Sequence, residues 1–199
     1  MKLIYTLLVF IVLLLIWSGI KPFEYFTWFL EVLPALLGIL ILIFTFTRFR
    51  FTNLVYILIF IHCVILIIGG HYSYAEVPLF NDLQEAFHQT RNNYDKLGHF
   101  AQGFVPAMII RELLIRKQII NGSGWRNFIT VCIAMAISVT YEFIEWFISV
   151  FTGEGGDSFL GTQGYVWDTQ SDMLYATIGA VFALVFLSRI HNFQIEKIN

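Results

Sequence analysis

Long stretches without formal charge alternate with short polar segments along the whole chain. Five such stretches stand out, at residues 3–20, 32–47, 51–70, 127–141 and 173–188. A sixth, residues 97–110, is interrupted only by His99 and Gln102. With its flanks each stretch reaches roughly 20 residues, the length at which a helix crosses ~30 Å of hydrocarbon. The pattern predicts an all-α, polytopic membrane protein with about six transmembrane helices.

We expect a single transmembrane domain over residues 1–199. Its six spans are predicted at about residues 3–20, 27–47, 51–70, 95–115, 127–150 and 167–189. Between the third and fourth spans, an amphipathic run over residues 79–87 predicts a short interfacial helix with Asn81 as its N-cap. Residues 152–167 contain five glycines, so this loop can bend tightly and approach a ligand or a neighbouring chain closely.

Composition agrees with a membrane protein. Hydrophobic residues make up 58% of the 199 residues and charged residues only 13%, whereas charged residues are about a quarter of soluble domains. A soluble helical bundle is disfavoured, because six such stretches leave almost no polar faces to meet water. Cys63 and Cys132 both fall within predicted spans, so neither a disulfide framework nor a cysteine metal site is expected.

The basic residues predict which side of the membrane each loop faces. With both termini in the cytoplasm, nine of the twelve lie at the inner ends of spans, and only Lys21, Arg91 and Lys96 lie outside. The positive-inside rule therefore places the N- and C-termini in the cytoplasm. Twelve of the fourteen acids show the opposite preference, all except Glu112 and Glu196.

Six ionisable side chains cluster near the outer ends of the last three predicted spans: Asp95, His99, Glu142, Glu145, Asp168 and Asp172. They form three pairs, each with members three or four residues apart, so both members of a pair share one helix face. Two of these spans enter from outside and the middle one leaves there, which brings all six within about 12 Å of the outer boundary at ~1.5 Å per residue. We predict that they meet in one outward-facing pocket and carry its chemistry.

Five carboxylates cannot all remain ionised in a low-dielectric pocket without compensation. Shared protons, the neighbouring Arg91 and Lys96, or a bound cation can supply it. Carboxylates with a histidine suit Zn²⁺, Mn²⁺ or Fe²⁺, and an all-oxygen subset suits Mg²⁺ or Ca²⁺. We predict a divalent metal of unspecified identity with ligands drawn from His99, Glu142, Glu145, Asp168 and Asp172. A metal-free acid–base or proton-linked site and a structural polar network are the alternatives.

The other ionisable residues are open to structural or topological interpretations. The pattern leaves open the roles of Glu31, His62 and His71, since a single polar side chain in a span often only bonds a neighbouring helix. We expect His88 and His191 at the surface. The remaining basic cluster is interpreted as a topology and lipid-headgroup signal, with no nucleic-acid partner: Arg111, Arg116, Lys117 and Arg126.

Three segments of the sequence resemble a known family. They are Asn-Asn-Tyr-Asp-Lys-Leu-Gly-His-Phe at 92–100, Tyr-Glu-Phe-Ile-Glu-Trp at 141–146, and Phe-Leu-Gly-Thr-Gln-Gly-Tyr-Val-Trp-Asp-Thr-Gln at 159–170. Together they are similar to the YjdF family of bacterial inner-membrane proteins, whose function is not established, and the likeness extends over about residues 71–189. The Asp-Lys-x-x-His opening is more loosely similar to VanZ-like membrane proteins.

Two positions depart from the YjdF pattern. Tyr165 and Ser171 stand where that pattern has Asp and Trp, so an obligatory carboxylate at 165 is not expected here. The resemblance implies the fold and a location in the bacterial inner membrane, and it brings no reaction with it.

Two functional classes are compatible with these patterns. The first is a membrane-embedded, metal-dependent enzyme acting on a lipid or lipid-linked substrate, with catalytic residues among the six clustered side chains. The second is a proton- or cation-linked transporter, and a non-catalytic accessory protein is a further alternative. The clustering of acids at one face favours the enzyme, because a transporter needs polar groups across the membrane. Nucleophile-elbow, Walker and zincin motifs are absent from the sequence.

Overall fold

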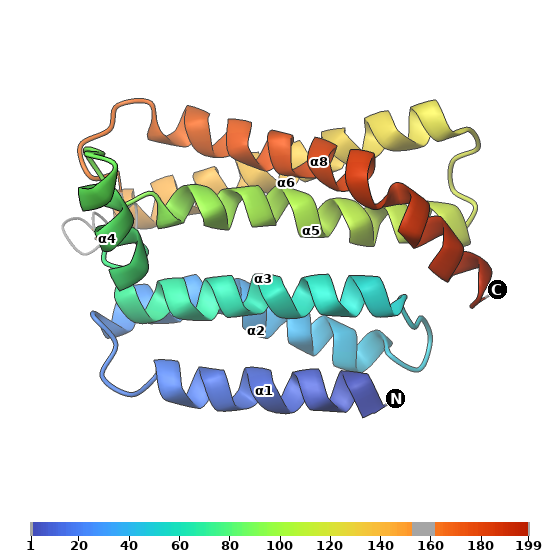
Figure 1. Cartoon of the computed structure of the whole chain (residues 1–199), viewed down its shortest axis with the longest axis horizontal. Helices are drawn as coiled ribbons and strands as arrows, with labels where there is room; N and C mark the ends of the chain where they lie inside the picture. The colour runs from blue at the N-terminus through green and yellow to red at the C-terminus, as the bar shows by residue number, and fades with distance from the viewer. Residues whose placement is uncertain (1, 153–161, 199) are drawn as a thin grey trace.

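The computed structural model describes residues 2–152 and 162–198, and in these ranges the chain forms seven α-helices and no strand. The helices are α1 (Lys2–Ser18), α2 (Tyr25–Thr45), α3 (Asn53–Tyr72), α4 (Pro78–Ala86), α5 (Tyr94–Arg116), α6 (Ser123–Thr152) and α8 (Asp168–Glu196). All except α4 run along the long axis of the molecule, and the two termini lie at the same end (Figure 1). The prediction of an all-α protein is confirmed. Most of the predicted glycine-rich loop, residues 153–161, lies outside the described residues.

Local hydrogen bonds define several helix ends. The Glu24 carboxylate accepts from the main-chain N–H groups of Phe26 and Thr27 and caps α2. Burial raises the pKa of Glu24, but the hydrogen bonds from Thr27 and Phe26 outweigh it and leave this pKa below its ordinary value. At the other end of the bundle, the Thr52 side chain caps α3 by accepting from Val55 N–H.

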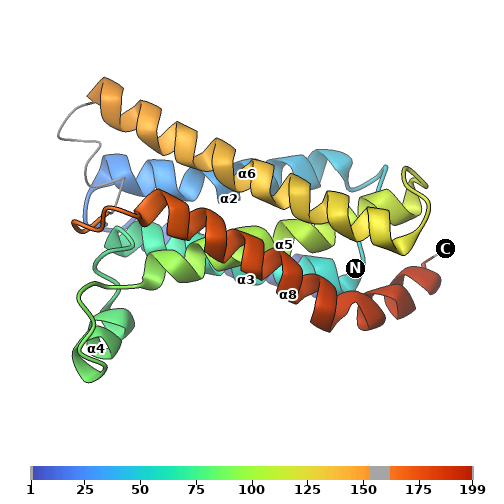
Figure 2. The ribbon, with the colours of Figure 1, turned by 90° about the horizontal axis from the view of Figure 1, so that it is seen from above.

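The short helix α4 stands across the end of the bundle opposite the termini and projects away from the other helices (Figure 2). A short helix was predicted here, but the prediction that Asn81 caps it is wrong. The helix begins after Val77 with Pro78 in its first turn, where proline's missing N–H is not needed. Asn81 lies inside the helix and accepts a hydrogen bond of 2.6 Å from Asn92, which ties α4 to the segment before α5.

Four helices are long and apolar enough to cross a membrane, namely α2, α3, α6 and α8. The apolar helix α1 has only 17 residues. Helix α5 has 23 residues, but its ends carry charges, so it is less apolar than the other long helices. Length and composition therefore establish a multi-pass helical membrane protein without establishing the predicted count of six spans. Helices α6 and α8 also extend past the predicted limits 127–150 and 167–189.

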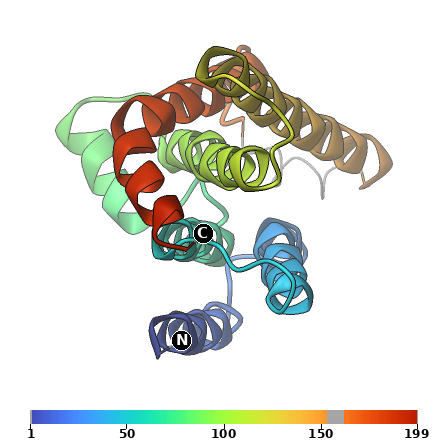
Figure 3. The same ribbon diagram turned by 90° about the vertical axis from the view of Figure 1, so that its right-hand side faces the viewer.

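Helix α5 lies at the centre of the packing, in contact with α8, α6 and α3. Helix α3 in turn contacts α1 and α2, so α3 and α5 join two groups of helices (Figure 3). The core where they meet includes the fully buried Val55, Ala107, Met108 and Ala180. A charged helix is thus enclosed by more apolar ones, which keeps its polar side chains away from lipid.

The contact between α5 and α8 is very close because small residues line it. A Cβ atom added at Gly103 would lie 1.7 Å from the Ala176 carbonyl oxygen, and one added at Gly179 would lie 2.1 Å from the Phe100 carbonyl oxygen. Small residues let helix backbones approach each other inside membranes, where packing replaces the hydrophobic effect as the main source of association. These two glycines therefore fix how α5 and α8 present their polar side chains to each other.

We expect Gly103→Ala to lower the free energy of unfolding by at least about 2 kcal/mol, because the new methyl group must displace backbone. Gly124→Ala is the matched control, since a Cβ at Gly124 meets no atom within 4 Å. Unfolding of both variants in mixed detergent micelles, followed by circular dichroism, measures the difference. Equal stability of the two variants would show that α5 and α8 do not pack through Gly103.

Candidate functional site

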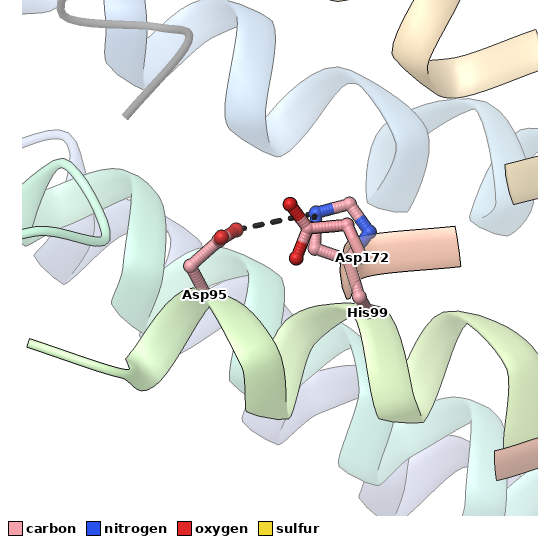
Figure 4. Close-up of side chains that lie close together, drawn as sticks. All are labelled: Asp95, His99 and Asp172. Atoms are coloured by element: carbon pink, nitrogen blue, oxygen red, sulfur yellow. Dashed lines mark ion pairs between the residues drawn. The ribbon is translucent and has the colours of Figure 1, made fainter. Parts of the chain in front are cut away.

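Three ionisable side chains meet between α5 and α8, near the end of the bundle that carries α4. Asp95 and His99 lie one turn apart on α5, and Asp172 approaches them from α8 (Figure 4). His99 Nε2 lies 3.2 Å from Asp95 Oδ1 and 3.8 Å from Asp172 Oδ1. One potential ligand atom from each residue lies within 4.8 Å of the others. Ligands on opposite sides of a cation are about 4–5 Å apart at bond lengths of roughly 2.0–2.6 Å, so one ion can reach all three.

Two basic side chains form an ion-pair network with the neighbouring acids. Lys96 Nζ lies 2.5 Å from Asp168 Oδ1 and 2.7 Å from Asp172 Oδ1. Arg91 Nη1 also donates to Asp168 Oδ1, and Arg91 Nη2 lies 3.5 Å from Asp95 Oδ2. Asp168 is therefore bonded to two bases and lies beside the three-residue group, whereas Asp95 and Asp172 belong to both. Compensation by Arg91 and Lys96, one of the possibilities open from the sequence, is realised for Asp168.

The two glutamates of α6 occupy the other side of His99. Glu142 Oε1 lies 3.7 Å from His99 Nδ1. This oxygen is buried and has no hydrogen-bond partner within the described part of the chain. Glu145 is half-buried and lines a cavity next to Asp95 and His99. Of the six predicted site residues, four thus surround His99 at contact distance or across the cavity, and Asp168 is held in the adjoining ion pairs.

A cavity of about 230 Å³ extends from His99 into the bundle between α2, α3, α5 and α6. Glu31, His62, Tyr141 and Glu145 line it together with His99. His62 Nε2 has no hydrogen-bond partner among the described residues. Two residues left open by the sequence, Glu31 and His62, therefore face the same cavity as Asp95, His99 and Glu145.

His71 does not face this cavity. Its Nδ1 lies 2.8 Å from the Ser18 carbonyl oxygen, and its ring lies 4.4 Å from the Trp17 ring. His71 thus packs the end of α3 against the end of α1.

A second buried polar network lies at the opposite end of α5 and corrects the expectation that His191 is a surface residue. His191 has no exposed surface, and its Nε2 lies 2.9 Å from Glu112 Oε2. Arg111 Nη1 lies 3.0 Å from His191 Nδ1. Because a guanidinium can only donate, Nδ1 must accept, and Nε2 therefore carries the proton donated to Glu112. Thr52 N–H and Oγ1 also donate to Glu112, which joins the start of α3 to α5 and α8.

The burial of Arg111 corrects the interpretation of the basic cluster as a purely headgroup-facing signal. Arg111 is 2% exposed and donates to His191 and Asn192. Arg116 donates to Glu112 with a distance of 2.8 Å. Sequence reasoning missed this network because Glu112 and His191 are 79 residues apart. The available signal was an acid flanked by arginines inside an otherwise apolar span.

The fold and the polar clusters define an all-helical, multi-pass membrane protein with buried charge at both ends of its central helix. Residues 3–193 match the family described as "Predicted membrane protein (DUF2238)", and the chain belongs to that family. It is 46% identical to the inner membrane protein YjdF of Escherichia coli strain K12 over 185 residues, which are 93% of this chain and 88% of that protein. The resemblance to YjdF proteins is thus confirmed. No solved structure matches the chain.

We expect Lys96→Met to lower the free energy of unfolding by roughly 3–5 kcal/mol, because it leaves the buried Asp168 and Asp172 short of a counter-charge. The double variant Lys96→Met/Asp172→Asn should recover part of this loss, since it also removes one of the uncompensated acids. Chemical unfolding in detergent measures both. Lys2→Met, at an exposed position, is the control and should change stability by less than about 0.5 kcal/mol. A Lys96→Met protein as stable as this control would contradict the ion-pair network.

Proposed function

We propose that this protein is a six-span enzyme of the bacterial inner membrane that depends on a divalent cation and acts on a lipid or lipid-linked substrate. The observation that carries the proposal is the group formed by Asp95, His99 and Asp172, whose potential ligand atoms lie within 4.8 Å of one another. Two carboxylates and an imidazole match Zn²⁺, Mn²⁺ or Fe²⁺ in ligand type, with Mg²⁺ less suited because it prefers oxygen alone.

Three protein ligands leave coordination positions open, which is the arrangement of catalytic rather than structural metal sites. The cation would polarise a substrate oxygen or a bound water. Glu142 lies beside His99, and its Oε1 has no hydrogen-bond partner in the described part of the chain, so it can accept a proton or add a ligand. Glu145, across the cavity, is placed to act as a second acid or base.

Six spans follow if α1 and α5 also cross the membrane. Both run along the same axis as the four helices that are long and apolar enough (Figure 1). Helix α5 can do so despite its charges because they are buried against α8, α6 and α3 rather than facing lipid. An even number of spans agrees with both termini lying at one end of the bundle, and the basic residues assign that end to the cytoplasm. The cation site then faces the outer side.

A proton- or cation-linked transporter is the second candidate, and one observation favours it. Helix α5 carries a buried ionisable group at each end, with His99 at one and Glu112 bonded to His191 at the other. Titratable groups distributed across a membrane are typical of proton pathways. His62, with an unpartnered Nε2, lines the cavity that extends inward from His99.

The orientation is tested by C-terminal fusions. We expect a fluorescent protein fused to the C-terminus to fluoresce and alkaline phosphatase at the same junction to be inactive, because nine of the twelve basic residues would then face the cytoplasm. An active phosphatase fusion would reverse the orientation and place the cation site on the cytoplasmic side.

The cation is tested by elemental analysis of detergent-purified protein. We expect about one divalent ion per chain in the parent protein, and at least a tenfold loss of bound ion in Asp95→Asn/Asp172→Asn, since two of three ligands are weakened. Asp82→Asn, at an exposed position on α4, is the control and should retain the ion. Retention should also fall as the pH is lowered, because protons compete with the cation for carboxylates and imidazole.

Folded parent protein that binds no ion, and whose stability does not respond to added Zn²⁺, Mn²⁺ or Mg²⁺, would overturn the cation-dependent enzyme. Proton uptake by proteoliposomes that is lost in a His99→Gln variant would in that case establish the transporter.

A further inference from the structure

The polar cavity beside His99 adjoins an apolar groove that runs toward the terminal end of the bundle. The groove has a volume of about 400 Å³ and shares Pro34, His62 and Leu66 with the cavity. Its remaining walls are mainly aliphatic and aromatic side chains of α2, α3 and α5, for example Ile59 and Ile109. A space lined by charged side chains thus adjoins one that is almost entirely hydrocarbon-lined.

The groove is long enough for a hydrocarbon chain. Its lining on α5 ends at Leu113, which is about 21 Å along the helix from His99 at ~1.5 Å per residue. An engineered protein cavity of roughly 150 Å³ holds benzene, so by proportion about 400 Å³ accommodates on the order of 16 carbon atoms. Gly38 adds to this space, because a Cβ built there would meet no atom within 4 Å.

A third, apolar hollow lies between α2 and α6, next to the cavity. Pro34, Ile137 and Tyr141 line both this hollow and the cavity. Helix α2 packs on α3, and in the described part of the chain it makes no comparable contact with α5 or α6 (Figure 3). This hollow is thus the side on which a molecule dissolved in the membrane would come nearest to the cavity.

Resting on the proposed function, we infer that the groove binds the linear hydrocarbon chain of a single-chain phospholipid-type substrate, whose phosphate completes the coordination of the cation at Asp95, His99 and Asp172. The apolar walls of the groove suit the hydrocarbon chain of the lipid. Its binding there is favoured by the van der Waals contacts that it makes with the side chains of the walls. The headgroup reaches a site rich in carboxylates, which repel a phosphate unless the cation is bound. Headgroup binding thus depends on the metal, whereas chain binding depends on the groove.

The test uses lysophosphatidylglycerol with a diazirine at the end of a 16-carbon chain, incorporated at trace level into nanodiscs that hold the full-length protein with Mn²⁺ or Zn²⁺. After irradiation, mass spectrometry of peptides locates the attached probe. We expect saturable labelling, at most one probe per chain, concentrated on residues toward the far end of the groove, such as Phe51, Ile109 and Leu113. Bulk lipid would instead label the lipid-facing surfaces of α1 and α8 without saturation.

Two comparisons distinguish binding of the hydrocarbon chain from binding of the headgroup. Gly38→Leu fills the groove and should reduce groove labelling at least tenfold, whereas Gly124→Leu, outside the groove and equally free of neighbours within 4 Å, should label like the parent. Removal of the metal with a chelator should weaken probe binding in the parent protein.

Undiminished groove labelling in Gly38→Leu would overturn the chain site even if the protein retains its metal. Loss of labelling in Gly38→Leu, with no effect of the chelator, would keep the site for the hydrocarbon chain and overturn the metal-bound headgroup, whereas the cation dependence itself is decided by the elemental analysis.

Discussion

The structure depends on burying a charged helix in a membrane protein. Helix α5 carries Asp95 and Lys96 at one end and Arg111 and Glu112 at the other, and none of these can face hydrocarbon without a large penalty. Lys96, Arg111 and Glu112 instead meet partners on α8 or at the start of α3. Asp95 is compensated by Lys96 and His99 of α5 itself and by Arg91 just before it. The close approach of α5 and α8 through small residues brings these partners within reach, so packing and charge compensation constrain one another.

The two ends of α5 resolve the same problem differently. Around Glu112 the carboxylate accepts from several donors at once, with His191 fixed between Arg111 and the carboxylate, which is the signature of a structural network. Around His99 the acids outnumber the bases, and Glu142 keeps an unpartnered oxygen among the described residues. A buried site whose polar atoms lack hydrogen-bond partners costs stability. At the mouth of a cavity such a site is typical of ligand binding.

The arrangement of the spaces between helices narrows the chemistry further. The cavity beside His99 shares wall residues with an apolar groove and with a hollow between α2 and α6. A water-soluble substrate would gain nothing from apolar walls. An amphiphile fits better, because its polar headgroup suits the charged cavity and its hydrocarbon chain suits the groove. The proposed enzyme on a lipid or lipid-linked substrate and the proposed site for its chain therefore rest on the same geometry, yet they fail separately, because the cation and the groove are altered by different variants.

The sequence by itself determined the membrane class and the all-helical fold, because hydrophobic length and helical spacing are local properties of the chain. Its motifs indicated the family, which the comparisons confirm, and its helical spacing predicted six residues for the candidate site. Only the tertiary structure decided that Lys96 and Arg91 bind Asp168, that Asp95, His99 and Asp172 come together, and that Glu31 and His62 face the same cavity. It also turned His191 from an expected surface residue into the partner of Glu112. These relations join residues on different helices, and a periodic pattern shows which face of a helix is polar without showing which other helix that face will meet.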